Sequence, residues 1–284
     1  MMKANTIILL LSGISMPLIA MAYSLIRKPE WHDTAKNPSW TAMNVISFIV
    51  GSVFGVIAAA YELYTTAKGS ASMPIGTQAY IAQVFGTVGW SAYHFTVSDW
   101  KTTKINRHTL RLLLAIQLTT SLIYCFTIPG NGRWVFALIT VLLTTVSLIV
   151  PLIAFPKKDR KTRKPVMKDG RKQYRKLIPM GMSDARGLAL MMAACFPLLT
   201  GAFIFPILGF LLLGFALTVY FFAYSGVMTT TTNEKGGIEV VGKTTEGAQR
   251  ILANKAGSLR KQSIPLGPAI AIPFAIAMLV WLFV

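Results

Sequence analysis

Runs of about 20 consecutive, mostly apolar residues recur along almost the whole chain, and they limit its fold more than any other feature. A helix of that length crosses the hydrocarbon core of a bilayer. Of the 284 residues, 54% are apolar and only 13% are charged, which is too little charge to cover the surface of a soluble domain. The sequence therefore predicts an all-α polytopic integral membrane protein.

The apolar runs divide into about eight predicted transmembrane helices. These spans lie at residues 5–26, 41–66, 78–98, 108–128, 134–155, 184–203, 206–227 and 265–284. The first run is long for the apolar part of a cleaved signal peptide, and we interpret it as a retained span. Only a tight turn separates the sixth span from the seventh. The last run contains three prolines, so its beginning is expected to be irregular or re-entrant.

Positive charge is distributed unevenly between the loops. Loops with several Lys and Arg residues alternate with loops that have at most one, and the basic loops lie at 27–40, 99–107, 156–183 and 228–264. Because cytoplasmic loops collect positive charge, this alternation puts the basic loops in the cytoplasm and both termini outside. It also accounts for the net charge of +18 without a nucleic-acid partner. Loop 156–183 contains 11 Lys and Arg residues and is expected to contact anionic membrane lipid.

The loop at 228–264 is polar and rich in glycine, which is typical of a connecting segment. Residues 238–241 read Ile-Glu-Val-Val and are compatible with a short strand. An ordinary connecting loop is the favoured interpretation.

The chain has two cysteines, Cys125 and Cys195, and both lie inside apolar runs. The sequence contains no CxxC motif, which excludes a cysteine-ligated zinc site of the common spacing. We interpret both residues as small apolar members of the core, and we expect no metal or other cofactor.

Two of the ten acidic residues lie at the ends of predicted spans. Asp99 ends the third span and Asp184 opens the sixth. Ionisable groups at membrane depth are costly, so each is a candidate functional residue, although headgroups alone could wet both. His94 is expected to be structural or interfacial, and Glu62 is expected to be an interfacial cap near the other membrane surface. Arg186 is favoured as a snorkelling anchor.

Three segments around these aspartates form a pattern. Asp99 is followed by a basic stretch, by Ile-Asn at 105–106 and by an apolar helix. Residues 181–184 read Gly-Met-Ser-Asp, with Arg186 two positions later and a Leu- and Ala-rich helix beyond. Residues 264–268 read Ile-Pro-Leu-Gly-Pro and open the last apolar run. In this order, the segments resemble the type IV prepilin peptidases, which are GxGD-type intramembrane aspartic proteases.

The resemblance covers roughly residues 80–284 and has two departures. Ser183 replaces the second glycine of the GxGD motif, and Asn106 stands where proline is usual. Serine is costly if that position requires a positive φ, which leaves an inactive relative as an alternative. Without CxxC motifs, the chain resembles the short members of the family, which lack the cysteine-rich methyltransferase part and only cleave.

The resemblance implies an aspartic endopeptidase in which Asp99 and Asp184 are the catalytic residues. It implies that residues 1–77 form an N-terminal two-span region and residues 78–284 a catalytic membrane domain. Its substrates would be pilin-like precursors, which lose a basic leader at the cytoplasmic face of the inner (cytoplasmic) membrane. The other site residues that it assigns are Gly181 and Ser183 in an active-site turn, and Arg186, Lys101, Pro265, Gly267 and Pro268 in substrate binding or support.

A different class of function fits the same aspartates. In a small proton- or cation-coupled transporter, Asp99 and Asp184 would line an ion path. The sequence shows no pair of similar halves, which disfavours this alternative. A non-catalytic membrane scaffold, in which both aspartates are dispensable, is a third interpretation.

Overall fold

The computed structural model describes residues 2–27, 40–69, 73–102, 106–127, 133–156, 167–168, 171–172, 174–176, 182–199, 228–232, 238–242 and 267–283. Within them lie seven α-helices: α1 (Met2–Ile26), α2 (Trp40–Ala67), α3 (Ile75–Thr102), α4 (Arg107–Thr127), α5 (Arg133–Ile149), α6 (Met182–Leu199) and α9 (Gly267–Phe283). The span expected at 206–227 lies outside the described residues.

The described part of the chain is almost entirely helical and supports the predicted all-α membrane fold. Three helices are long and apolar enough to cross a membrane, at Ala4–Ile26, Trp40–Ala67 and Arg107–Thr127. The helices α5 and α9 are apolar but shorter. The helix α3 is as long as α2 but carries more polar side chains.

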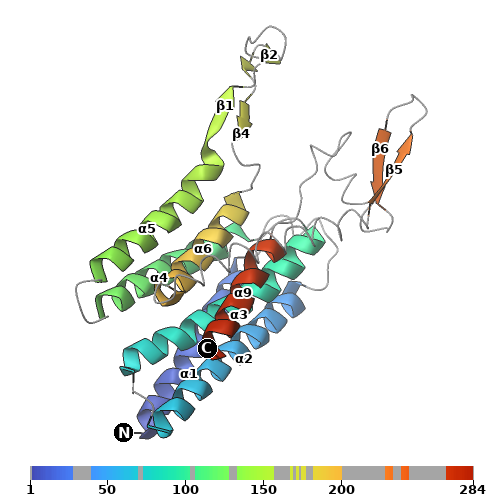
Figure 1. Ribbon diagram of the computed structural model, residues 1–284. Coiled ribbons are helices and arrows are strands. Elements are labelled where there is room, and N and C mark those ends of the chain that lie inside the picture. The colour runs from blue at the N-terminus through green and yellow to red at the C-terminus, as the bar shows by residue number, and fades with distance from the viewer. Residues whose placement is uncertain are drawn as a thin grey trace.

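From α1 to α6 each helix runs opposite to the one before it, and α9 runs in the same direction as α6. The helix ends that adjoin the basic loops therefore lie at one end of the bundle, which we call the basic end (Figure 1). There Asn106 Nδ2 donates a hydrogen bond of 3.2 Å to the carbonyl of Arg27, joining the end of α1 to the start of α4. At the opposite, charge-poor end, Gln78 Nε2 donates to Thr66 Oγ1 at 2.8 Å and joins α2 to α3. The predicted alternation of loop charge therefore corresponds to two distinct ends of the fold.

The helices α1, α2 and α3 pack backbone to backbone through glycines. Pro17 has no amide hydrogen, so the carbonyl of Gly13, four residues earlier, lacks its regular donor within α1. That carbonyl lies against Gly55 of α2 and Gly86 of α3, and a Cβ on either would collide with its oxygen. Small residues permit this close approach, which supplies the packing that stabilises helices in a membrane.

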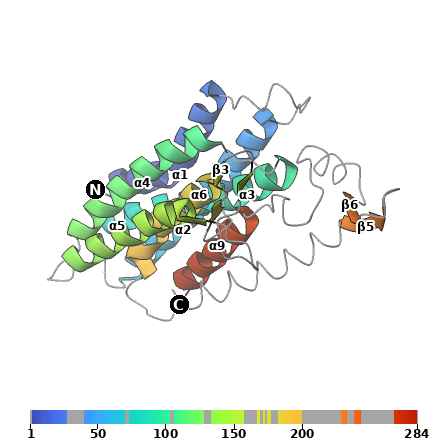
Figure 2. The same ribbon diagram turned by 90° about the horizontal axis from the view of Figure 1, so that it is seen from above.

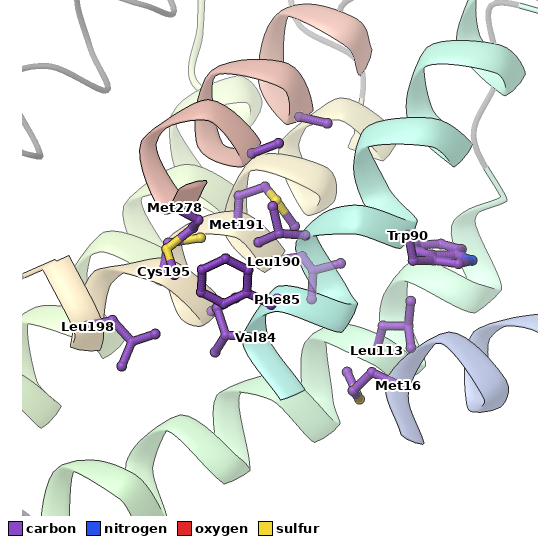
Figure 3. Packing of buried hydrophobic residues seen from close by; sticks show 14 of the residues in the cluster. Met16, Val84, Phe85, Trp90, Leu113, Leu190, Met191, Cys195, Leu198 and Met278 are labelled. Carbon is purple, nitrogen blue, oxygen red and sulfur yellow. The ribbon is translucent and has the colours of Figure 1, made fainter. Parts of the chain in front are cut away.

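The helix α6 lies between α5 and α9 in both views (Figure 1 and Figure 2). Its apolar side chains meet α3 and α9 in the main core cluster, where Phe85 of α3 lies beside Leu190 and Cys195 of α6 and Met278 of α9 (Figure 3). Cys195 and Cys125 are both buried and free, which confirms their predicted place in the core.

Short antiparallel strand pairs lie in two segments that were expected to be loop or helix end, within residues 154–176 and 228–242. The helix α5 ends at Ile149, six residues before the predicted span end, because Pro151 follows within a 3₁₀ turn at Val150–Leu152. The strands β1 (Ala154–Pro156) and β4 (Tyr174–Lys176) then pair antiparallel, as do β2 (Met167–Lys168) and β3 (Arg171–Lys172).

The third hairpin pairs β5 (Met228–Thr232) with β6 (Ile238–Gly242). The favoured interpretation of residues 238–241 as ordinary loop was therefore wrong, and the alternative of a short strand was correct. Both strands are rich in Thr, Ile and Val, whose branched side chains favour extended backbone.

Candidate active site

The two candidate catalytic aspartates lie on α3 and α6, near the basic end. Asp184 is partly exposed in the first turn of α6, where the positive end of the helix dipole favours a carboxylate. Asp99 lies within α3, which continues to Thr102 rather than ending at the aspartate as the sequence predicted. The side chain of Asp99 lies outside what the structure describes.

A close contact between α3 and α6 lies one turn away from both aspartates. A Cβ on Gly187 would lie only 2.9 Å from Cε2 of Phe95, so the ring of Phe95 occupies the space that glycine leaves. Asp99 follows Phe95 by four residues, and Asp184 precedes Gly187 by three. The helices run in opposite directions (Figure 1), so both steps lead toward the basic end. The register therefore carries positions 99 and 184 to similar levels, about 4.5–6 Å beyond the contact.

The turn predicted before Asp184 is helical where the structure describes it. The helix α6 begins at Met182, so Ser183 lies in its first turn and has no need of the positive φ that glycine allows. Serine in place of the second glycine of the motif is therefore compatible with this backbone. Gly181 lies outside the described residues.

Asn106, the other departure from the family pattern, has two structural roles. Its side-chain oxygen accepts hydrogen bonds from the amides of His108 at 3.1 Å and Thr109 at 3.4 Å, which caps the N-terminus of α4. Its amide group donates to the carbonyl of Arg27, as described above. Asparagine is buried here and fixes the start of the helix that follows Asp99 in the chain.

The remaining predicted site residues that the structure describes lie on α3, α6 and α9. Arg186 is partly exposed two residues beyond Asp184, and Lys101 lies in the last turn of α3, with its side chain outside the description. Gly267 is the buried first residue of α9, and Pro268 follows it. The helix α9 packs against both α3 and α6, and its first turn lies at the basic end (Figure 1). Pro265 lies outside the described residues.

A hydrogen-bond network that the sequence analysis missed ties α6 to α3 and α4. Pro197 lacks the amide hydrogen that would bond the carbonyl of Ala193 within α6. Ser121 Oγ of α4 lies 2.5 Å from that carbonyl oxygen, and Tyr80 OH of α3 lies 3.0 Å from the carbonyl of Ala194. Hydroxyls of neighbouring helices thus bond carbonyls near the proline, which is how prolines are tolerated in membrane helices.

The network continues through the interior of the bundle. Tyr80 OH and Ser121 Oγ lie 2.8 Å apart, and Gln117 Nε2 donates to Ser121 Oγ at 3.3 Å. Thr87 of α3 donates to Gln117 Oε1 at 3.1 Å. Polar residues lie four apart at 83 and 87 in α3 and at 117 and 121 in α4. This spacing puts each pair on one helix face, so the sequence could have predicted a polar contact between the two helices.

His94 and Glu62, which ranked below the aspartates, both lie inside the bundle. The ring of His94 stacks on Trp90 with centroids 4.5 Å apart, and its Nδ1 lies 3.3 Å from Ser47 Oγ. This is the structural role that the sequence predicted for His94. Glu62 lies near the charge-poor end and is only 5% exposed, more buried than an interfacial cap requires.

The site was also compared with metal-ligand geometry and with known proteins. Within the part of the chain that the structure describes, no three His, Cys, Asp or Glu side chains gather as they would around a metal ion. Comparisons with protein-family models, with curated proteins and with solved structures found no match.

Proposed function

We propose that this chain is an intramembrane aspartic endopeptidase that removes the basic leader from type IV pilin-like precursors at the cytoplasmic face of the inner membrane. The observation that carries the proposal is the contact of Phe95 with Gly187, one turn from both aspartates. The reaction requires two carboxylates close enough to share one proton. Two antiparallel helices in contact at this register can supply such a pair.

The proposed mechanism uses Asp99 and Asp184 as one acid–base unit. The ionised carboxylate takes a proton from a water molecule, whose oxygen attacks the scissile peptide carbon. The protonated carboxyl group donates its proton to the leaving amine as the C–N bond breaks. The reaction consumes one water molecule, which supports a site at the wetted end of the bundle rather than at mid-membrane.

The proposed topology follows from the loop charges and has about eight spans. Both aspartates then face the cytoplasm, where a leader rich in Lys and Arg would meet them while the apolar segment of the precursor stays in the bilayer. The first turn of α9, with Gly267 and Pro268, begins at the same end of the bundle (Figure 1).

Leader removal by single-residue variants tests this proposal. The chain is co-expressed with a pilin-like precursor, and the fraction cleaved is measured by mass spectrometry. Asp99→Asn and Asp184→Asn keep the side-chain size but prevent proton exchange, so each is expected to lower the cleavage rate at least about 100-fold. The double variant is expected to be no slower than either single variant, because the two groups act as a unit.

Asp33→Asn, in the first basic loop, is the matched control and is expected to cleave at the unmodified rate. Near-normal cleavage by either Asp99→Asn or Asp184→Asn contradicts the protease assignment.

One observation favours the second candidate, an ion-coupled transporter. Hydrogen-bonded polar groups from Tyr80 through Gln117 to Thr87 line the interior below the aspartates, as an ion path requires. Proton flux into liposomes that contain the purified chain separates the two functions. A transporter predicts flux that Asp184→Asn abolishes, whereas the protease predicts no flux above that of empty liposomes.

A further inference from the structure

The helix α5 has an exposed apolar stripe that continues past the end of the helix. Its members recur every three or four residues and are between 44% and 68% exposed, at Leu138, Leu142, Val146, Ile149, Leu152 and Phe155. In a membrane protein, an apolar face left uncovered by other helices meets acyl chains. The last member of the stripe, Phe155, therefore marks the height at which the bilayer core ends beside α5.

Positive charge begins directly beyond this boundary. Lys157 is the second residue after Phe155, and residues 157–176 contain 11 Lys and Arg residues but only two acidic ones. The change from an uncovered apolar surface to a dense basic one thus takes place within two residues. A bilayer shows the matching order, because its apolar acyl chains are followed by anionic headgroups.

Because β1 and β4 pair, the C-terminal end of this basic segment lies beside the same boundary. Phe155 pairs with Arg175, and Ala154 pairs with Lys176. Lys168 and Arg171 instead pair with each other on β2 and β3, which lie farther from the helices (Figure 1). The chain from Arg171 to Arg175 spans up to about 13 Å when extended.

We propose that the base of this hairpin, comprising residues 154–156 and 174–176, binds anionic phospholipid headgroups together with Lys157, the next residue in the sequence. The pairing puts the backbone of Arg175 and Lys176 beside the boundary at Phe155, and Lys157 follows Phe155 by two residues in the sequence. Tyr174 is an aromatic residue of the kind enriched at headgroup height. The cations on β2 and β3 lie farther along the hairpin from that plane, and screening over about 8 Å weakens their attraction to it. The inference requires α5 to lie in a membrane, but it does not depend on the proposed protease activity.

Lipid retention by the full chain tests the proposal. The protein is purified in mixed micelles that contain equal amounts of phosphatidylglycerol and phosphatidylcholine, and the bound lipid is measured by mass spectrometry. The unmodified chain is expected to be enriched several-fold in phosphatidylglycerol, and 0.5 M NaCl in the buffer is expected to reduce the enrichment.

Two triple variants remove the same charge at different heights. The base variant replaces Lys157, Arg175 and Lys176 with Gln and is expected to lose most of the enrichment, approaching the composition of the micelle. The tip variant replaces Lys168, Arg171 and Lys172 with Gln and is expected to keep most of it.

Three outcomes overturn the proposal. The first is an unmodified chain without enrichment, as expected if the hairpin instead binds an acidic protein. The second is equal loss in both variants, which would show a response to net charge alone. The third is full retention by the base variant. Unfolding temperatures in detergent identify any variant that is misfolded, and in that case single Gln substitutions at the base replace the triple variant.

Discussion

Of the described helices that contain an internal proline, α1 and α6 accommodate the carbonyl left without its helical donor in different ways. Pro17 leaves the carbonyl of Gly13 without its helical donor, and Pro197 does the same to the carbonyl of Ala193. The first carbonyl lies against glycine backbone of α2 and α3. The second meets the hydroxyl of Ser121 on α4.

The two helices are therefore bound to their neighbours by different interactions. In the α1–α3 unit, contact depends on the absence of side chains, so its energy comes from close packing and tolerates no added atom. The helix α6, which carries Asp184, is bound through directional hydrogen bonds that particular hydroxyls supply. Steric substitutions should therefore damage the first region, and removal of polar atoms should damage the second.

The largest expected effect is from Gly55→Ala. The new methyl group meets the carbonyl of Gly13, which is backbone and can retreat only if α1 and α2 separate. We expect a loss of about 3 kcal/mol in the free energy of unfolding, at the upper end of overpacking effects, as measured by denaturation in mixed micelles.

Gly76→Ala in α3 is the matched control, because a Cβ there meets nothing within 4 Å. It should be neutral or stabilise the protein by up to about 1 kcal/mol through better helix propensity. Equal effects of the two substitutions would contradict the steric account of α1–α3.

A smaller loss is expected from Ser121→Ala. It removes the hydroxyl that contacts the carbonyl of Ala193 and leaves Tyr80 as the nearest hydroxyl to this part of α6. The expected destabilisation is about 1 kcal/mol in the same unfolding measurement, in keeping with hydrogen bonds between membrane helices. Thr119→Ala, which removes an exposed hydroxyl bonded within α4 itself, should change the stability by less. A greater loss for Thr119→Ala would refute the role of Ser121.

The smallest effect, and the sharpest contrast, is a coupling between substitutions. Pro197→Ala restores an amide hydrogen that can bond the carbonyl of Ala193, so Ser121→Ala should cost less in that background, by about 0.5 kcal/mol. Pro17→Ala should not reduce the destabilisation caused by Gly55→Ala, because that destabilisation comes from a steric collision and not from a missing hydrogen bond. A double-mutant cycle for each pair measures both terms, and equal coupling in the two pairs would remove the distinction between the regions.

The sequence predicted the helices well because runs of apolar residues long enough to span a bilayer have few alternatives. It did not predict that α3 would run past Asp99 to Thr102, since the polar residues after Val97 resemble a loop by composition. The hairpin of β1 and β4 was missed because its strands are only three residues long and depend on pairing across about 20 residues of sequence.

Within the candidate site, the aspartates and their neighbours were identifiable from the family pattern, but the support around them was not. Nothing local distinguishes Gly187 from other glycines in apolar runs, since its contact with Phe95 arises from the packing of two distant helices. The hydrogen-bond network of the interior could have been predicted in part from the polar pairs spaced by four residues. Its link to Pro197 required knowing which helices are neighbours.

The central claim is that positions 99 and 184 meet as one catalytic unit, and a cross-linking experiment tests it with built-in controls. All variants carry alanine at Cys125 and Cys195, so that only the introduced cysteines react. The pair Phe95→Cys with Gly187→Cys reports the contact between α3 and α6. The pair Asp99→Cys with Arg133→Cys joins opposite ends of the bundle and should not react.

The deciding measurement is the yield of cross-linked protein for Asp99→Cys with Asp184→Cys, treated in membranes with a short bifunctional thiol reagent and followed by intact-mass spectrometry. Helix geometry puts these positions within one turn of the contact between Phe95 and Gly187. We therefore expect a yield close to that of the contact pair. A yield as low as that of the pair from opposite ends, while the contact pair reacts, would contradict the account.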